Sequence, residues 1–325
     1  MKRSTFLLSA AAALVAAASP AFAADKFPSR PVTLVVPFTP GSGSDTIARI
    51  IAPRLSARWG QPVVVENKPG ASGNIGTLFA ARAPADGHTL LMAINTHTIT
   101  PAIYRNNLPY DAERDFAPIT KLAEANFTLA VNPALPVQDM KSLIAYAKAH
   151  PGRLDYASPG NGTPHHMAME LLKSTYGVSL VHVPYKGISG AMTDLMGGQV
   201  QLMFASVPSV RTQAQAGKVR LIAVTGDKRS SQIPDVHTFR EQGFAAMDAI
   251  DAWYAVLAPA RTAPDLVQRL NHDFGEVMNT EDVKAELARQ GLQVRTGTPA
   301  QLADLMHRDI ARWQKVVDSA GIKAD

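Results

Sequence analysis

Short apolar runs alternate with amphipathic segments over much of this chain. Residues 32–36 (VTLVV) form a β-branched apolar run of the kind expected for a buried strand, and residues 63–65 and 88–94 form two more. Apolar residues at helical spacing begin between these runs at Ile47 and Ile75. The resulting order β-α-β-α-β predicts a doubly wound α/β lobe.

A second α/β series follows residues 119–132, which we expect to cross between two lobes as a strand. Its predicted elements are a helix at 142–150, a strand at 154–157, a helix from Pro164, strands at 180–184 and 200–205, and a short helix at 191–196. A strand at 219–225 is predicted to return the chain to the first lobe, and the remainder is mainly helical. We therefore predict that residues 24–124 and 226–325 form lobe 1 and that residues 125–225 form lobe 2.

Three junctions between a strand and a helix carry glycine, serine or threonine, near Ser42, Thr163 and Ser189. The first turn of a helix presents free backbone N–H groups and the positive end of the helix dipole, so such a junction suits a carboxylate. If the lobes face each other, the junctions hold a dicarboxylate at both ends through neutral donors, which orient an anion without transferring a proton. The alternative at the first junction is that Ser44 or Asp45 only caps the helix.

The first 23 residues have the pattern of a secretory signal peptide: Lys2 and Arg3, an apolar run at 6–18, and the small-x-small sequence AFA at 21–23. The run is too short for a membrane anchor, and no later apolar run reaches the ~18–20 residues that span a bilayer. The chain has no cysteine, which excludes disulfides, thiol catalysis and a lipid-modified cysteine. We therefore predict an exported, soluble periplasmic protein, cleaved near Ala23.

The net charge and the missing motifs disfavour nucleic-acid binding and cofactor or metal chemistry. The formal net charge is +5, or +3 without Lys2 and Arg3, and no basic run interleaved with aromatics indicates nucleic-acid binding. The motifs G-x-S-x-G, G-x-x-x-x-G-K-[ST] and H-E-x-x-H are missing. Residues 160–162 (GNG) lack the third glycine of a dinucleotide fingerprint, so we expect no cofactor. His165 and His166 are adjacent and diverge by about 100° on a helix, which disfavours a shared metal. Ser158 with His166 leaves an exported hydrolase as an alternative, although no third triad member is visible.

The chain contains the stretches VTLVVPFTPGSGSD, QPVVVENKPGASGNIG, SPGNGTPHHMAMELL and HVPYKGISGAMTDLMGGQV. Together they resemble the substrate-binding receptors of tripartite tricarboxylate transporters, also called the Bug family, over essentially the whole mature chain. The resemblance implies an α/β, type II periplasmic-binding-protein fold, with two doubly wound lobes joined by two crossovers around a ligand cleft. It implies a monomeric receptor, not an enzyme, that captures a small di-, tri- or aromatic carboxylate and delivers it to membrane permease subunits. The alternative recipient is a signalling partner, for which the receptor acts as a ligand sensor.

In that family, backbone amides, hydroxyls and ordered waters hold the ligand carboxylate between loops of the two lobes. The resemblance implies the first-lobe positions Thr39, Gly41, Ser42, Gly43, Asp45 and Thr96. It implies the second-lobe positions Ser158, Gly162, Thr163, His166, Tyr185 and Lys186. Two departures stand out: Ser42 replaces a usual glycine, and Ala205 occupies a position where many members carry an aspartate that meets a ligand amine. Ala205 therefore disfavours an amino-acid ligand.

Overall fold

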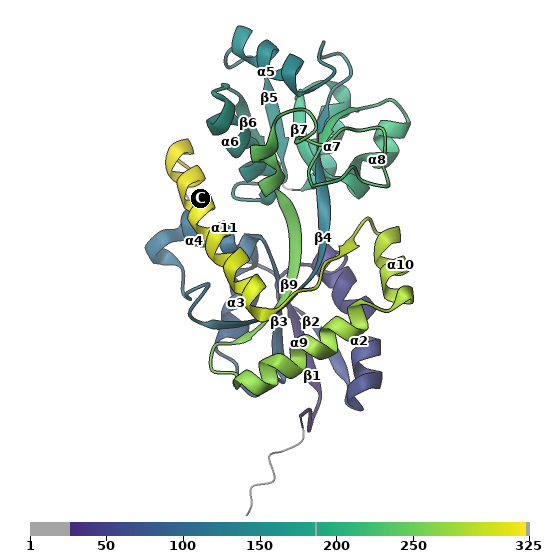
Figure 1. The fold of residues 1–325 in the computed structure, drawn as a ribbon. Coiled ribbons are helices and arrows are strands. Elements are labelled where there is room, and N and C mark those ends of the chain that lie inside the picture. Colours follow the sequence, from purple (N-terminus) through teal and green to yellow (C-terminus); the bar gives the residue numbers. More distant parts are fainter. Residues whose placement is uncertain (1–26, 186, 323–325) are drawn as a thin grey trace, which may run out of the picture.

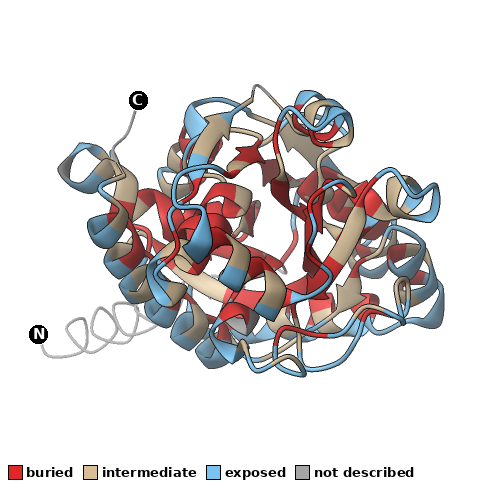
Figure 2. Ribbon diagram, turned by 90° about the horizontal axis from the view of Figure 1, so that it is seen from above, coloured by how far each residue is buried: buried red, intermediate tan, exposed pale blue. Residues whose placement is uncertain are grey.

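The computed structural model describes residues 27–185 and 187–322, which form two α/β lobes stacked on one another (Figure 1). The predicted signal peptide and Lys186 lie outside the described residues. None of the described helices is both long and apolar enough to cross a membrane. Seen from above, the buried residues gather on the inner strands and inward helix faces, while exposed residues form the periphery (Figure 2).

The first lobe is built on a sheet with the strand order β2-β1-β3-β9-β4-β10. Its strands are β1 (Val32–Val36), β2 (Val63–Asn67), β3 (Thr89–Ile94), β9 (Asp251–Pro259), the first part of β4 (Phe116–Val131) and β10 (Gln293–Val294). β1, β2 and β3 are parallel, whereas β9 runs antiparallel to both β3 and β4. The carboxyl ends of β1 to β3 therefore meet at one edge of the sheet, where loops of α/β folds bind ligands.

Helices cover both faces of this sheet. The helices of this lobe are α2 (Gly43–Trp59), α3 (Asn74–Ala81), α4 (Thr96–Tyr104), α9 (Pro264–Met278), α10 (Glu281–Arg289) and α11 (Pro299–Ala320). α2 and α9 bury one face, where Leu34 and Ile51 are inaccessible to solvent, and α3 and the start of α11 bury the other, where Trp253 is inaccessible. This burial on both sides explains why the strand β1 is apolar at almost every position.

The second lobe repeats the plan on a sheet with the order β6-β5-β7-β4-β8. Its other strands are β5 (Asp155–Ser158), β6 (Val181–Pro184), β7 (Leu202–Ser206) and β8 (Arg220–Val224), and its helices are α5 (Met140–Ala149), α6 (Pro164–Tyr176), α7 (Ile188–Gly197) and α8 (Val207–Gln215). β5 is parallel to β6 and β7, and β4 is antiparallel to its neighbours. The predicted strands and helices appear in the predicted order in both series, whereas α4, α8 and β9 were not predicted.

β4 carries the chain from one lobe to the other. Its residues up to Asn126 pair with β9 in the first sheet, and those from Phe127 pair with β7 and β8 in the second. At about 3.3 Å per residue, 16 residues reach across both sheets. β4 is therefore the predicted first crossover.

The return to the first lobe comes later than expected. The strand predicted at 219–225 is β8, which stays in the second sheet. The following segment also contacts the second lobe, since Phe239 N donates to Val224 O (3.0 Å) and Gln242 Nε2 donates to Ile222 O (2.7 Å). We therefore propose a lobe boundary near Asp251, at the start of β9, instead of near residue 225.

The C-terminal helix α11 contacts both lobes. It packs on α4 and β4 and also reaches α6 of the second lobe (Figure 1). Its start is fixed by a capping box, in which Thr298 and Gln301 exchange side-chain to backbone hydrogen bonds. Trp313, buried in the main core, anchors its second half.

Candidate ligand-binding site

The loop between β1 and α2 is shaped by the buried carboxylate of Asp45. Gly41 N (2.8 Å), Arg49 Nε (2.9 Å) and Asn67 Nδ2 (2.9 Å) all donate to it. Burial alone would raise the pKa of Asp45, but these hydrogen bonds outweigh it and hold the pKa below its usual value. The carboxylate is therefore occupied by donors from its own loop, from α2 and from β2.

The donors of this loop lie at the N-terminus of α2. Ser42 caps the helix by accepting from Asp45 N (3.3 Å), and its own amide donates to Thr39 O (3.2 Å). Gly41 adopts a φ of +82°, which favours glycine. The helix begins at Gly43, whose first-turn amides have no intrahelical acceptor. Capping and an anion-suited N-terminus, which the sequence offered as alternatives, are thus both features of one loop.

Tyr254 on β9 lies directly against this loop and was missed in the sequence analysis. A Cβ atom added to Gly43 would lie 2.3 Å from the Tyr254 hydroxyl oxygen, so only glycine fits there without displacement. Burial raises the pKa of Tyr254 to about 12, so the phenol keeps its proton at neutral pH. Its signal in the sequence was weak because a tyrosine beside a tryptophan in an apolar strand resembles ordinary core.

The loop after β3 places Thr96 at the start of α4, buried beside a small polar cavity. The cavity has a volume of about 10 Å³ and is lined by Phe38, Ser72, Thr96, His97 and Tyr110 among others. Such a volume matches a single water molecule. Burial lowers the pKa of His97 to about 4, so its ring is neutral, and Nε2 bonds to Ala112 O (2.8 Å).

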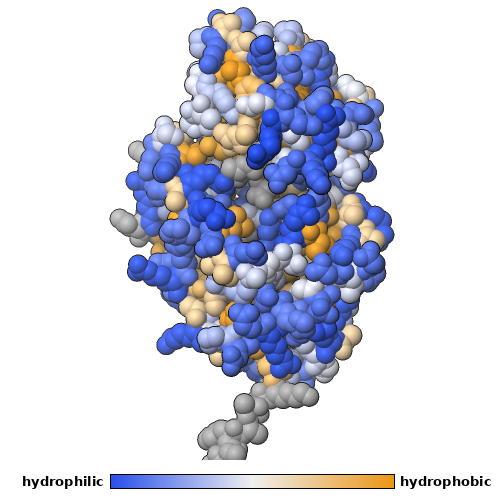
Figure 3. All heavy atoms as spheres, in the orientation of Figure 1, coloured by the Kyte–Doolittle hydropathy of each residue, from blue (hydrophilic) through white to orange (hydrophobic). Residues whose placement is uncertain are grey.

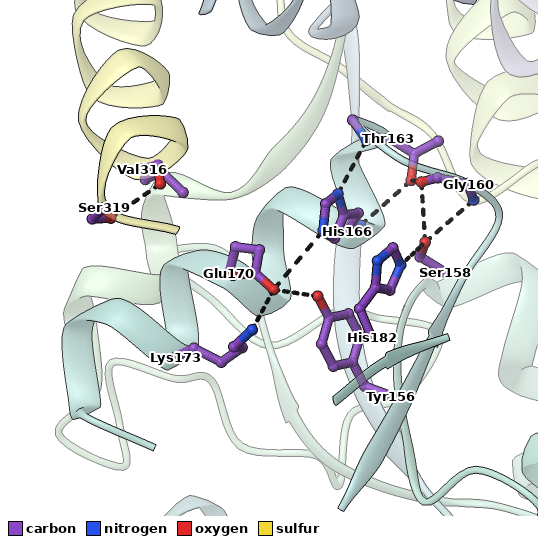
Figure 4. A network of polar contacts seen from close by, with 11 residues as sticks. Tyr156, Ser158, Gly160, Thr163, His166, Glu170, Lys173, His182, Val316 and Ser319 are labelled. Atoms are coloured by element: carbon purple, nitrogen blue, oxygen red, sulfur yellow. Dashed lines mark hydrogen bonds and ion pairs between the residues drawn. The ribbon is translucent and has the colours of Figure 1, made fainter. Parts of the chain in front are cut away.

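In the second lobe, the loop between β5 and α6 is held by its own side chains (Figure 4). Thr163 is the N-cap of α6: its hydroxyl donates to Gly160 O (2.8 Å) and accepts from His166 N (3.4 Å). Gly162 N donates to Nδ1 of His166 (3.0 Å). The loop therefore presents the N-terminus of α6 in a fixed shape.

The side chains of His166, His182 and Tyr156 form a stack of three rings beside this loop. His182 was not predicted as part of the site. His166 and His182 stack at 4.0 Å between ring centroids, and His182 and Tyr156 stack at 4.8 Å. Glu170 accepts from the Tyr156 hydroxyl and from Lys173 Nζ, which lies 2.6 Å away. Burial, with His182 and Lys173 adding to it, lowers the pKa of His166 to about 3, so this imidazole is neutral. The only sequence signal for His182 is a histidine inside an apolar strand.

The hydrolase pair of Ser158 and His166, which the sequence left as an alternative, does not form. Ser158 is fully buried, and its hydroxyl contacts Nε2 of His182 (2.7 Å) instead of His166. The Nδ1 atom of His166 already accepts from the Gly162 amide. Ser158 and His166 are therefore parts of the loop scaffold and do not form a nucleophile with its base.

The remaining predicted second-lobe positions are Tyr185, Lys186 and Ala205, of which Tyr185 and Ala205 have different environments. The Tyr185 hydroxyl donates to Asp194 Oδ2 (2.6 Å), and burial together with this carboxylate raises its pKa to about 12. Ala205 is fully buried in the apolar core of the second lobe, so its side chain faces that core. Lys186 lies outside the described residues. Ser206, the residue after Ala205, holds the N-cap position of α8 at the end of β7, and its hydroxyl, which we did not predict, donates to Ser209 Oγ (3.1 Å).

The two lobes touch where α4 meets the β5–α6 loop. A Cβ atom added to Gly162 would lie 2.4 Å from Cδ1 of Ile103 on α4. Thr96 precedes Ile103 by two turns of the same helix, a distance of about 10 Å along its axis. α4 therefore links the ligand loops of the first lobe to the loop of the second lobe. The surface on the side shown in Figure 3 is mostly polar, with small apolar patches.

No group of three or more histidine, aspartate or glutamate side chains in the described part of the chain is arranged to hold a metal ion. The site instead consists of helix N-termini, hydroxyls and neutral rings. Two α/β lobes joined by crossover strands, with such loops at the carboxyl ends of their strands, define the class of two-lobed solute-binding proteins.

Comparison with known proteins identifies the family. Residues 47–322 match the model of the tripartite tricarboxylate transporter family receptor, and the chain belongs to this family. BugT of Bordetella pertussis is 34% identical over 92% of both chains. An R. palustris protein solved with adipate is 35% identical with a TM-score of 0.78, covering 91% of this chain and 99% of its own. MatC from Rhodopseudomonas palustris, with bound malate, is 32% identical with a TM-score of 0.75, covering 90% and 100%.

These findings confirm three predictions: the Bug-type family, the periplasmic-binding-protein fold, and a receptor instead of an enzyme. The exported hydrolase is thereby excluded, in agreement with the buried Ser158.

Proposed function

We propose that this protein is a periplasmic receptor that captures a small dicarboxylate between its lobes and delivers it to a tripartite tricarboxylate-type permease. The observation that carries the proposal is the pair of fixed helix N-termini, α2 at the β1 end and α6 at the β5 end, each capped by a hydroxyl residue. Relatives solved with adipate and with malate support a dicarboxylate, since both molecules carry a carboxylate at each end.

The charge distribution favours an anion held by neutral donors. The nearby carboxylates of Asp45 and Glu170 already accept hydrogen bonds from their own lobes. His166 is neutral, so it adds no positive charge. Backbone amides and hydroxyls thus remain to bind the ligand, and they suit a carboxylate at the N-terminus of a helix.

Capture is proposed to couple to lobe closure. β4 and β9 connect the lobes, and the contact between Ile103 and Gly162 lies where they meet. A ligand that binds loops of both lobes stabilises the closed form by its differential affinity for that form. The closed receptor then presents the bound carboxylate to the permease as a monomer.

A thermal-shift screen of the chain from Ala24 tests the proposal. Adipate, malate, citrate, benzoate and an uncharged diamide of adipate are added at increasing concentration. A ligand that binds only the folded state adds about 2.7 kcal/mol to the unfolding free energy at a hundredfold excess over Kd, and it therefore raises the melting temperature. We expect a rise with a dicarboxylate and none with the diamide. If no carboxylate raises the melting temperature, even after unfolding and refolding have removed any retained ligand, the proposal is wrong.

A further inference from the structure

Within residues 27–185 and 187–322, the hydroxyl of Tyr254 makes no hydrogen bond, although its ring packs at the edge of the main core. The other tyrosines whose pKa is raised by burial behave differently: Tyr110 donates to Asn74 Oδ1 (2.7 Å), Tyr156 donates to Glu170, and Tyr185 donates to Asp194. Tyr254 is only partly buried, so its hydroxyl can reach an acceptor outside the folded chain.

The position of this hydroxyl points to a ligand at the first-lobe loop. A Cβ atom added to Gly43 would lie 2.3 Å from the Tyr254 oxygen, so the phenol oxygen lies directly against the first residue of α2. Because Gly43 begins α2, the oxygen also adjoins the free amides of that helix. A phenol and a helix N-terminus therefore present donors to one spot.

We propose that Tyr254 donates a hydrogen bond to the ligand carboxylate held at the N-terminus of α2, and that it is a specificity-determining residue of the receptor. The inference rests on the proposed function and adds a residue to the site. A carboxylate fits because the phenol and the first-turn amides of α2 are donors, while Asp45 in the same loop is occupied by three hydrogen bonds. A carboxamide places N–H groups against these donors and is rejected.

The placement of Tyr254 also connects the ligand to the crossover. Tyr254 pairs with Ile94 at the end of β3 and with Ala123 on β4, so it belongs to the strands that join the lobes. A carboxylate bound by both α2 and Tyr254 therefore contacts a rigid lobe and the strand that returns from the other lobe. Ligand binding at this point acts directly on the connection between the lobes.

The variant Tyr254→Phe removes only the hydroxyl. We expect the Kd for adipate or malate, whichever stabilises the wild type, to rise about tenfold or more by calorimetry, because a hydrogen bond to a charged group is lost. The melting temperature of the ligand-free protein should stay unchanged, since the hydroxyl makes no hydrogen bond in the part of the chain that the structure describes. Tyr146→Phe on α5 is the control, and it should alter neither quantity.

Each other outcome overturns the inference. If Tyr254→Phe binds as tightly as the wild type, the phenol does not contact the ligand, while the proposed function stands on wild-type binding. If the variant loses stability without ligand, the hydroxyl has a structural role. If the wild type binds no carboxylate at all, the proposed function fails first, and the inference fails with it.

Discussion

Replacing Asp45 by asparagine tests the reasoning about the first loop. The Asp45 side chain is nearly inaccessible, and it accepts from Gly41 N, Arg49 Nε and Asn67 Nδ2. Gly41 and Arg49 share Oδ2, whereas Asn67 uses Oδ1, so an asparagine must turn its NH2 group toward at least one donor. The loop then loses an acceptor and also the negative charge.

The expected loss of unfolding free energy in Asp45→Asn follows from these contacts. One or more buried donors without a partner, together with weaker remaining bonds, cost about 2–4 kcal/mol of unfolding free energy. For a chain of this size the melting temperature falls by roughly 5–10 °C. The control is Asp282→Asn, since Asp282 is 63% exposed and pairs with Arg54 at the surface. Loss of that exposed pair should leave the melting temperature nearly unchanged, because solvent screens it.

The pH dependence provides a second measurement on the same variants. The pKa of Asp45 is lowered from 3.8 in the folded protein, so its stabilisation is present above pH 3.8 and is lost as the pH falls through the lowered pKa. Urea unfolding between pH 7 and pH 2.5 should therefore show a steeper acid loss in the wild type than in Asp45→Asn. Equal stability of wild type and variant at pH 7, or parallel acid profiles, would refute the assignment of Asp45 as the organising acceptor of the loop.

Three further predictions concern the other contacts. Thr163→Val removes the N-cap of α6 and should lower carboxylate affinity by about 1–3 kcal/mol in calorimetry, whereas unchanged affinity would take Thr163 out of the site. Gly162→Ala places a Cβ at a φ of +69° and against Ile103, so it should weaken ligand binding. Adding Ile103→Ala should restore part of the lost affinity. A double variant that binds the ligand no more tightly than Gly162→Ala contradicts the lobe contact. His97 has a pKa of about 4 against 6.5 for the free group, so the unfolded chain binds its proton more readily and stability falls as the pH drops below 6.5. Between pH 7 and pH 5, His97 should lower the unfolding free energy by about 2 kcal/mol. The variant His97→Gln should lack this part of the pH dependence in urea unfolding. If the variant and the wild type lose stability equally between pH 7 and pH 5, His97 is not buried in its neutral form.

Periodicity and turn residues predicted most of the fold. The apolar runs marked β1, β3 and β7 because each is buried on both faces, and the Thr163–Pro164 start marked α6 because N-cap and first-turn preferences are local. The return crossover was misplaced because β8 is as apolar as a crossover strand, and only its pairing with β4 distinguishes it. Local patterns thus identify elements more readily than their partners.

The same limit applies to the candidate site. Backbone loops were predictable, since glycine, serine and threonine at strand ends leave a visible pattern. The direction of a side chain was not: Asp45 turns into its loop because Arg49 and Asn67 are there to meet it, and Ser158 meets a histidine from the neighbouring strand β6. Tyr254 escaped notice for a related reason, since its distance from Gly43 depends on a pairing between segments more than 200 residues apart in sequence.

The helix α11 has a consequence for how a solute enters. It is about 33 Å long, and it lies against α4 of one lobe and α6 of the other, along one flank of the molecule (Figure 1). Rotation about an axis close to this helix preserves both contacts, whereas separation of the lobes on its own flank would break one of them. We therefore expect the lobes to open by rotation about an axis close to α11, so that a solute enters from the flank opposite this helix.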